Sequence, residues 1–193
     1  ISCNLTNGDH LTENGKKEVL MSVQELRNKK IDIIFFSDFT RTRETAEIVK
    51  EELNIKDENF ISNTQIREFN VGIFDGKTWD DYYASREEKD WYFYKPQNGE
   101  SCKDMKIRLT KFLYEIEEKY KNKNVLIVTH EGPMRILVAG SLGWDDEEIQ
   151  KQLKNKIPQV KNAEIRKLDF TPLPHNDTYE LDPHRPFIDE VVL

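Results

Sequence analysis

The sequence predicts a three-layer α/β/α sandwich around a mostly parallel sheet, and three observations support this fold class. Two short apolar runs rich in β-branched residues, 31–37 and 124–129, are typical of strands buried on both faces. Each run is followed by a segment with helical periodicity, at about 41–53 and 133–142. A longer helix is expected between them, at about 102–119. Alternation of buried strands with helices of this length favours right-handed β-α-β units, with helices on both faces of the sheet.

The first helix is expected to begin after Thr12, because threonine is a good N-cap residue. It should continue to about Arg27. The apolar residues of this segment recur at helical spacing: Val19, Leu20, Val23 and Leu26. This spacing predicts one buried face.

Three segments outside these elements have a different character. Residues 79–97 are aromatic and charged without a clear period, so we expect a surface cap or an irregular helix beside a cleft. Residues 163–170 alternate between apolar and polar and predict an edge strand. Residues 171–186 contain four prolines and are typical of a linker. The predicted organisation is therefore one domain, 1–170, followed by a linker and strand, 171–193.

Composition limits the function classes. A chain of 193 residues is long enough for one good core, and 34% charged residues without a bilayer-length apolar run favour a cytoplasmic protein that does not enter a membrane. The net charge of −7 argues against a broad nonspecific nucleic-acid surface. Cys3 and Cys102 lie far apart without neighbours at metal-ligand spacing, so we expect free thiols and no metal site.

Polar side chains follow both predicted strands where the strands end. Arg41 lies at the start of a helix after the first strand, and His130 directly follows the second. Ligand-binding groups collect at this edge of an α/β sheet, and the Arg guanidinium matches two phosphate oxygens. Taken singly, an Arg or His in such a place is more often structural or solvent-facing. Arg43, two places from Arg41, is expected to face away from it.

A third candidate, Glu68, lies in the glycine-marked loop 66–76. A carboxyl group held in a cleft can have a raised pKa and act as a proton donor, although a loop Glu is usually solvated. Its neighbours decide between the two interpretations.

Five ordered blocks together resemble the histidine phosphatase (phosphoglycerate mutase-like) superfamily along residues 1–170. They are Leu11-Thr12-Glu13-x-Gly15, Ser37-x-Phe39-x-Arg41-Thr42-x-x-Thr45-Ala46, Arg67-Glu68-x-x-x-Gly72-x-x-Asp75-Gly76, Asn98-Gly99-Glu100-Ser101 and Val128-Thr129-His130-x-Gly132. The resemblance implies that Arg41 clamps a phosphate, that His130 binds it and stabilises transition-state charge, and that Glu68 protonates the leaving oxygen. It also implies a phosphorylated small-molecule substrate and no cofactor.

Two departures from the family pattern matter. No Arg-His-Gly motif occurs in the 193 residues, so the family's first strand and its nucleophilic histidine are expected outside this chain, and the chain alone is expected to be inactive. His10 is the nearest candidate substitute, past the position where the family places the nucleophile. Glu131 stands where the family usually has Gly, which adds a negative charge near the expected anion site.

The tail indicates a larger host. Residues 180–190, Glu180-Leu181-Asp182-x-His184-Arg185-Pro186-Phe187-Ile188-Asp189-Glu190, resemble a segment of class I isoleucyl-tRNA synthetases. This resemblance implies a module inserted in an isoleucine-tRNA ligase, whose parent reaction needs ATP and tRNA. Two alternatives stay open at this point: a free-standing phosphatase or phosphoglycerate mutase-like enzyme, and a non-catalytic structural or tRNA-contacting insert.

Overall fold

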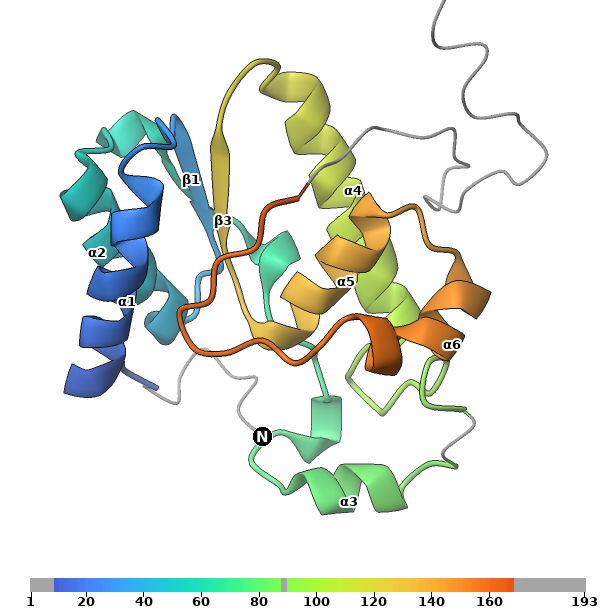
Figure 1. The fold of residues 1–193 in the computed structure, drawn as a ribbon. Helices are drawn as coiled ribbons and strands as arrows, with labels where there is room; N and C mark the ends of the chain where they lie inside the picture. The colour runs from blue at the N-terminus through green and yellow to red at the C-terminus, as the bar shows by residue number, and fades with distance from the viewer. Residues whose placement is uncertain (1–8, 88–89, 169–193) are drawn as a thin grey trace, which may run out of the picture.

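The computed structural model describes residues 9–87 and 90–168 of the chain (Figure 1). The helices and strands follow in the order α1 (Glu13–Leu26), β1 (Ile33–Phe36), α2 (Thr40–Leu53), β2 (Phe60–Ser62), α3 (Trp79–Ala84), α4 (Cys102–Lys119), β3 (Val125–Val128), α5 (Glu131–Ser141) and α6 (Asp146–Lys156). Three single turns of 3-10 helix, η1 (Asp57–Asn59), η2 (Thr64–Ile66) and η3 (Gly72–Phe74), lie between α2 and α3.

The three described strands form one parallel sheet in the order β2-β1-β3. Ile34 is paired with Phe60 on one side and with Leu126 on the other. The two strands expected from the sequence are confirmed with slightly shorter bounds. Strand β2 was not predicted, because three residues give too little pattern to separate a strand from a loop.

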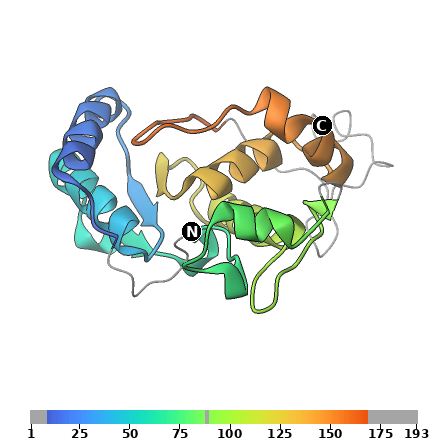
Figure 2. The same ribbon diagram turned by 90° about the horizontal axis from the view of Figure 1, so that it is seen from below.

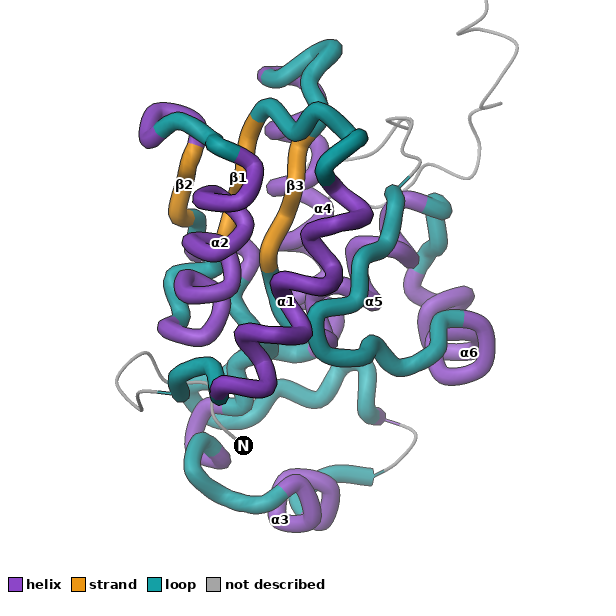
Figure 3. The backbone as a smooth tube through the Cα atoms, turned by 60° about the vertical axis from the view of Figure 1, so that its left-hand side comes forward, coloured by secondary structure: helices purple, strands orange, loops and turns teal. Residues whose placement is uncertain are grey.

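Alternate side chains of β1 face two helical layers, which confirms the three-layer α/β/α fold. Ile34 and Phe36 pack into an apolar cluster with residues of α1 and α2. Ile33 and Phe35 pack into a second cluster with residues of α4, α5 and α6. All four residues of β1 are buried, as expected for a central strand covered on both faces. Figures 2 and 3 show α1 and α2 on one side of the strands and α4 and α5 on the other.

Helix α1 begins as the sequence predicts. The Thr12 hydroxyl accepts a hydrogen bond from the backbone N–H of Gly15 at 3.0 Å. Val19, Val23 and Leu26 are buried, but Leu20 is 39% exposed. Its expected burial was wrong, because a residue directly after Val19 points about 100° away from it around the helix.

Helix α5 begins at Glu131, two residues before the expected start at Pro133. His130 is its N-cap residue, with extended backbone angles. Pro133 fits in the first turn because the N–H groups there have no partner within the helix. The candidate histidine therefore lies in the short connection between β3 and α5, which fixes its backbone from both sides.

The segment expected to form a cap does so (Figures 1 and 2). Helix α3 lies beyond the end of the sheet where α5 begins, and a capping box between Thr78 and Asp81 starts it. Val71, Phe74 and Tyr82 form an apolar cluster of their own in this region. The two ends of the cap segment meet at Gly72, which lies against the backbone of residues 97–99.

Residues 163–168 do not form the expected edge strand, and this prediction was wrong for the described part. A local turn occupies the Glu164 N–H, one of the backbone donors that a ladder would need. The N–H of Glu164 donates to the carbonyl of Lys161, whose own N–H donates to the Glu164 carboxylate. Ala163 and Ile165 instead pack against the α1 and α2 cluster. Residues 169–193, including the predicted linker and synthetase-like string, lie outside the described residues.

Within the described parts of the chain, no helix combines the length and apolar character needed to cross a bilayer. Cys102 is a free thiol, as expected, and burial raises its pKa to about 12. Cys3 lies outside the described residues.

Candidate phosphate-binding site

The carboxyl ends of all three described strands meet at one place and supply the candidate residues. Ser37 directly follows β1, and Arg41 lies in the first turn of α2. Glu68 follows the turn η2 after β2, and His130 follows β3. The structure brings Arg41 and His130 into direct contact. The Glu68 carboxyl group lies against Gly132 of α5, two residues after His130. The sequence expectation that these three side chains share one site agrees with this arrangement.

Arg41 and Ser37 fix the orientation of the His130 ring. The guanidinium Nη2 of Arg41 lies 3.1 Å from His130 Nδ1, and because a guanidinium only donates, Nδ1 must accept. The ring proton then sits on Nε2, which lies 2.9 Å from the Ser37 hydroxyl oxygen. Ser37 is fully buried, and the ring of Phe39 contacts the imidazole edge-on at 5.1 Å. His130 is therefore held in one tautomer.

The imidazole of His130 is neutral near pH 7. Only 7% of the residue is exposed, and burial lowers its pKa to about 3, with the Arg41 and Arg108 charges acting in the same direction. Asp38 opposes them. A phosphate brought against Nε2 would add negative charge beside the ring and would favour the imidazolium form.

The pKa of the Glu68 carboxyl group is shifted in the opposite direction. Burial raises its pKa, and the negative charge of Glu131 raises it further, while the N–H of Phe69 and the charges of Arg41 and Arg108 oppose the shift. A Cβ atom at Gly132 would lie 2.7 Å from Glu68 Oε1, so only glycine leaves room for this carboxyl group. The raised pKa favours a protonated carboxyl, which is the form that a general acid needs.

Arg108, on α4, holds the backbone around Glu68. Its guanidinium donates to the carbonyl of Gln65 at 2.7 Å and to the carbonyl of Glu68 at 3.2 Å. The same group forms a two-point ion pair with Glu100, at 2.8 and 2.6 Å. Both partners of this pair are mostly buried. The loop that carries Glu68 is thus attached to the helical layer.

Sequence reasoning missed Arg108, although a signal was present. It lies three residues after Met105 and four before Phe112, so a charged residue occupies the apolar face of α4. A charge at such a position has to find buried partners. Asp38 and Arg67 form a second missed pair, which ties the end of β1 to the Glu68 loop through a two-point contact. Arg67 holds the pKa of Asp38 below its usual range.

The segment before α1 reaches the same site. The Asp9 carboxylate accepts a hydrogen bond from Arg41 Nη1 at 3.3 Å. His10, the weak nucleophile candidate, is exposed and hydrogen-bonded to Glu44 at 2.5 Å. Its imidazole is therefore engaged with the first turns of α2 rather than with Arg41 or His130. Arg43 is exposed and contacts the Phe36 ring, as expected for a residue outside the site.

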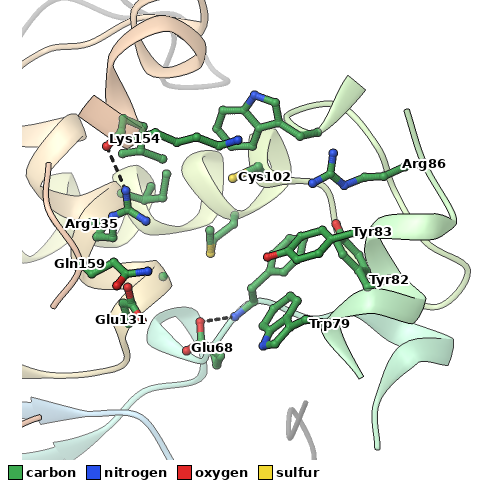
Figure 4. Close-up of a pocket in the computed structure, with 16 residues that line it drawn as sticks. Glu68, Trp79, Tyr82, Tyr83, Arg86, Cys102, Glu131, Arg135, Lys154 and Gln159 are labelled. Atoms are coloured by element: carbon green, nitrogen blue, oxygen red, sulfur yellow. Dashed lines mark hydrogen bonds between the residues drawn. The ribbon is translucent and has the colours of Figure 1, made fainter. Parts of the chain in front are cut away.

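A cavity of about 770 Å³ opens beside Glu68 (Figure 4). Glu68, Glu131 and Gly132 line one side of it. Trp79, Tyr82, Tyr83 and Arg86 line the side formed by the cap. Residues of α4, α5 and α6 complete the lining, and the charged Arg135 and Lys154 are among them. The cavity is far larger than one phosphate group, so it has room for the rest of a substrate.

Among residues 9–87 and 90–168, no cluster of three or more His, Cys, Asp or Glu side chains is arranged to hold a metal ion. The candidate groups are hydrogen-bond donors, one carboxylic acid and a neutral imidazole. Such a set can bind an oxyanion and exchange a proton with it.

Comparison with known proteins supports the fold and places the chain in a superfamily. A match to the histidine phosphatase superfamily (branch 1) extends over residues 6–173, and the chain belongs to this superfamily. Phosphoserine phosphatase 1 of Hydrogenobacter thermophilus is 30% identical over 141 residues, which cover 70% of this chain and 65% of that protein. The 2,3-bisphosphoglycerate-dependent phosphoglycerate mutase of Bartonella henselae is 29% identical over 161 residues, 78% of each chain. This chain thus aligns with less than two thirds of the first relative.

Solved structures share the fold. A mycobacterial glucosyl-3-phosphoglycerate phosphatase superposes with a TM-score of 0.68 at 19% identity, covering 83% of this chain and 78% of that one. YhfR of Bacillus stearothermophilus gives a TM-score of 0.66 at 24% identity, covering 83% and 81%. The alpha-ribazole phosphatase of Shigella flexneri gives 0.64 at 20% identity, covering 88% and 80%.

None of these relatives is an aminoacyl-tRNA ligase, so the synthetase interpretation of residues 180–190 gains no support from them. The family match agrees better with the alternative of a phosphatase or mutase-like enzyme. The first strand and nucleophilic histidine expected outside this chain stay a prediction, as do the ATP and tRNA partners of the proposed host.

Proposed function

We propose that this protein binds the phosphoryl group of a small phosphomonoester between Arg41 and His130 and that Glu68 serves as the acid for its hydrolysis. The contact between Arg41 Nη2 and His130 Nδ1 carries the proposal. It fixes the guanidinium and the imidazole at the carboxyl ends of adjacent parallel strands. The imidazole Nε2–H donates to Ser37 in this structure, so a bound phosphoryl oxygen would replace the Ser37 hydroxyl as its acceptor, while Arg41 supplies a charged donor.

The proposed chemistry has two steps. A histidine nitrogen attacks phosphorus, the bond from phosphorus to the ester oxygen breaks, and Glu68 gives its proton to the departing oxygen. Water then attacks the phosphohistidine, and the Glu68 carboxylate accepts the proton from that water as phosphate leaves. Arg41 and His130 hold the phosphoryl oxygens in both steps. The raised pKa of Glu68 supports its role in the first step.

The attacking histidine is expected to come from an Arg-His-Gly motif, which these 193 residues do not contain. Phosphate binding and turnover are therefore separate parts of the proposal. Phosphate binding is proposed to need Arg41 and His130, whereas a phosphoenzyme also needs the nucleophile. We expect the 193-residue chain to bind phosphate and not to hydrolyse p-nitrophenyl phosphate.

Orthophosphate titration by calorimetry tests the binding part. Loss of a charge-assisted hydrogen bond costs about 1.5–3 kcal/mol, so Arg41→Ala should weaken binding by about tenfold or more. The control is Arg27→Ala, because Arg27 is exposed and paired with Glu52 at the far end of α1. Equal affinities of the wild-type and Arg41→Ala chains would sink the proposal.

The hydrolysis part needs the protein expressed from its full natural gene, assayed with a panel of phosphometabolites. Glu68→Gln should slow release of the leaving group while phosphate still binds, because the amide cannot donate the required proton. Full turnover by Glu68→Gln would remove the acid role. Phosphoryl transfer between two positions of one substrate, rather than release of phosphate, would identify a mutase, the activity by which several relatives are named.

A further inference from the structure

One face of the cap is built from side chains that look into the cavity. Trp79, Tyr82, Tyr83 and Arg86 recur at the spacing i, i+3, i+4 and i+7. Trp79, Tyr82 and Tyr83 therefore lie on one face of α3, and Arg86 follows the C-cap residue Ser85. Figure 4 shows all four on one side of the pocket, across from Glu131. The name aromatic wall is used below for these four residues.

Two aromatic rings of this wall are half exposed beside the cavity. Trp79 is 46% exposed and Tyr83 is 53% exposed, and their rings are stacked at 5.8 Å with an interplanar angle of 22°. Tyr82 packs behind them, edge-on to Trp79. Large apolar faces that remain open to solvent beside a binding site gain free energy when a flat apolar group covers them.

Arg86 supplies a cation at the far side of the same wall. Its guanidinium lies over the rings of Tyr83 at 5.3 Å and Tyr82 at 5.5 Å, which orients it toward the pocket. Its Nε atom is buried without a hydrogen-bond partner, and within residues 9–87 and 90–168 no carboxylate forms an ion pair with it. Its hydrogen bond to the carbonyl of Glu87 is long, at 3.3 Å.

Arg135, the other arginine of the pocket, is less available. Its Nη2 donates to the carbonyls of Leu153 and Ile157, at 2.9 and 3.0 Å, and so holds the end of α6. The pocket therefore meets the candidate phosphate site at Glu68, although Arg41 and His130 do not line it, and it has a flat aromatic face that ends in the Arg86 guanidinium. The Nε atoms of Arg86 and Arg135 are both buried without a partner, but only Arg135 is held by two backbone carbonyls through Nη2.

We infer that the substrate is an aromatic phosphomonoester that carries a carboxylate, with its ring on Trp79 and Tyr83 and its carboxylate on Arg86. The inference rests on the proposed function, because it assumes that the phosphoryl group occupies the Arg41 and His130 end. A guanidinium binds a carboxylate through two parallel hydrogen bonds, and its planar stacking on tyrosine keeps that fork in place.

Four phosphonates, which cannot be hydrolysed, separate the two parts of the inference. They are propylphosphonate, 3-phosphonopropionate, benzylphosphonate and 4-carboxybenzylphosphonate, titrated into the 193-residue chain with orthophosphate as the reference. The benzyl group should improve affinity about fivefold over propyl, as expected for an aromatic contact. The ring-borne carboxylate should add about tenfold.

Variants assign each gain to its residue. Trp79→Leu should remove the advantage of benzyl over propyl and leave orthophosphate binding unchanged. Arg86→Gln should remove the gain from the ring-borne carboxylate, whereas Arg27→Gln should retain both gains. Circular dichroism shows whether each variant is folded, and a second pair, Tyr83→Leu and Arg86→Lys, replaces any that is not. Arg86→Lys should keep part of the gain, because lysine retains the charge without the fork.

The outcomes for the two proposals are distinct. If the wild-type chain does not bind orthophosphate, the proposed function fails, and this inference fails with it. If orthophosphate binds but the four phosphonates bind equally, only the inference is overturned. A carboxylate gain that persists in Arg86→Gln also overturns it, because the anion would then be held elsewhere.

Discussion

Arg41 donates to His130 at 3.1 Å across 89 residues of sequence, and this one contact sets the state of the candidate site. It forces Nδ1 to accept and leaves the Nε2 proton facing Ser37. The imidazole is thereby kept neutral and held in one orientation by groups of the protein itself. Both ring nitrogens are thus engaged, and a phosphate that accepts from Nε2 would have to take the place of the Ser37 hydroxyl.

The depressed pKa of His130 predicts a loss of stability in acid. Its pKa is about 3 in the folded chain and about 6.5 when unfolded, so between these values the unfolded chain binds more protons. The free energy of unfolding should then fall as pH decreases from 6.5, with a slope of at most about 1.4 kcal/mol per pH unit. Urea titrations of wild type and His130→Asn from about pH 4 to about pH 8, a range that spans the expected change, measure it.

Titration of Glu68 changes stability with pH in the opposite direction, so its contribution has to be removed by a control variant. Its raised folded pKa means that the folded chain binds more protons above the unfolded value of 4.5, and that stability is lost as pH rises through the folded pKa. The comparison of wild type with His130→Asn should therefore be repeated with Glu68→Gln in both chains. If the Glu68→Gln chain and the chain that also carries His130→Asn give parallel pH profiles, the prediction is contradicted.

Gly132→Ala should disturb Glu68 without unfolding the chain. The added Cβ would lie 2.7 Å from Glu68 Oε1, so the carboxyl group must move. Gly140→Ala is the matched control on the same helix, since its Cβ would lie 3.5 Å from the Thr110 hydroxyl oxygen, an ordinary contact. We expect Gly140→Ala to be neutral or to stabilise by up to about 1 kcal/mol, through helix propensity.

The readout for this pair is turnover of the natural full-length protein, with thermal unfolding as the check on folding. Gly132→Ala should lose most activity and keep its orthophosphate affinity within a few-fold. Unchanged turnover would mean that the carboxyl position is not critical for the reaction.

Arg108→Met should destabilise the chain strongly. It leaves the Glu100 carboxylate buried without its ionic partner and removes the donors to the carbonyls of Gln65 and Glu68. Breaking one side of a buried ion pair costs about 3–5 kcal/mol. The double variant Arg108→Met with Glu100→Gln should recover part of this loss in urea unfolding. A loss below about 1 kcal/mol for Arg108→Met would show that the contacts are not structural.

Two glycines of the cap loop separate backbone strain from crowding. Gly72 has φ of 56°, and a Cβ there would collide with the carbonyl oxygen of Gln97. Gly76 has φ of 79°, and a Cβ there would have no neighbour within 4 Å. Gly76→Ala should cost about 1–2 kcal/mol from strain alone, whereas Gly72→Ala should cost several times more. Thermal unfolding of the two variants makes the comparison, and equal losses would contradict it.

The fold was predictable because its central features are local. The runs 31–37 and 124–129 are apolar on both strand faces, and the helices around them have a clear period. Arg41 and His130 could be placed together because both follow parallel strands. The position of each residue directly after a predicted strand was enough to select it, and no distant contact had to be known.

The supporting contacts could not be predicted, because they join positions far apart in the chain. Arg108 reaches Gln65 over 43 residues, and no local pattern selects that carbonyl. The aromatic wall was missed for a different reason. Helix α3 is only six residues long, and Arg86 follows its end, so the helical period is too short to stand out among the aromatic residues of 79–97.

The cap owes its packing to Val71, Phe74 and Tyr82, an apolar group distinct from the two clusters that enclose the sheet. Under the proposed function, substitutions of Trp79, Tyr83 or Arg86, which are not members of this apolar group, would change what the protein prefers to bind while the sheet and its helices keep their packing. Substrate preference and the stability of the fold can then change independently during evolution. Under the proposed function, small changes at Trp79, Tyr83 and Arg86 would alter substrate preference without rebuilding the strand ends where we propose that phosphate binds.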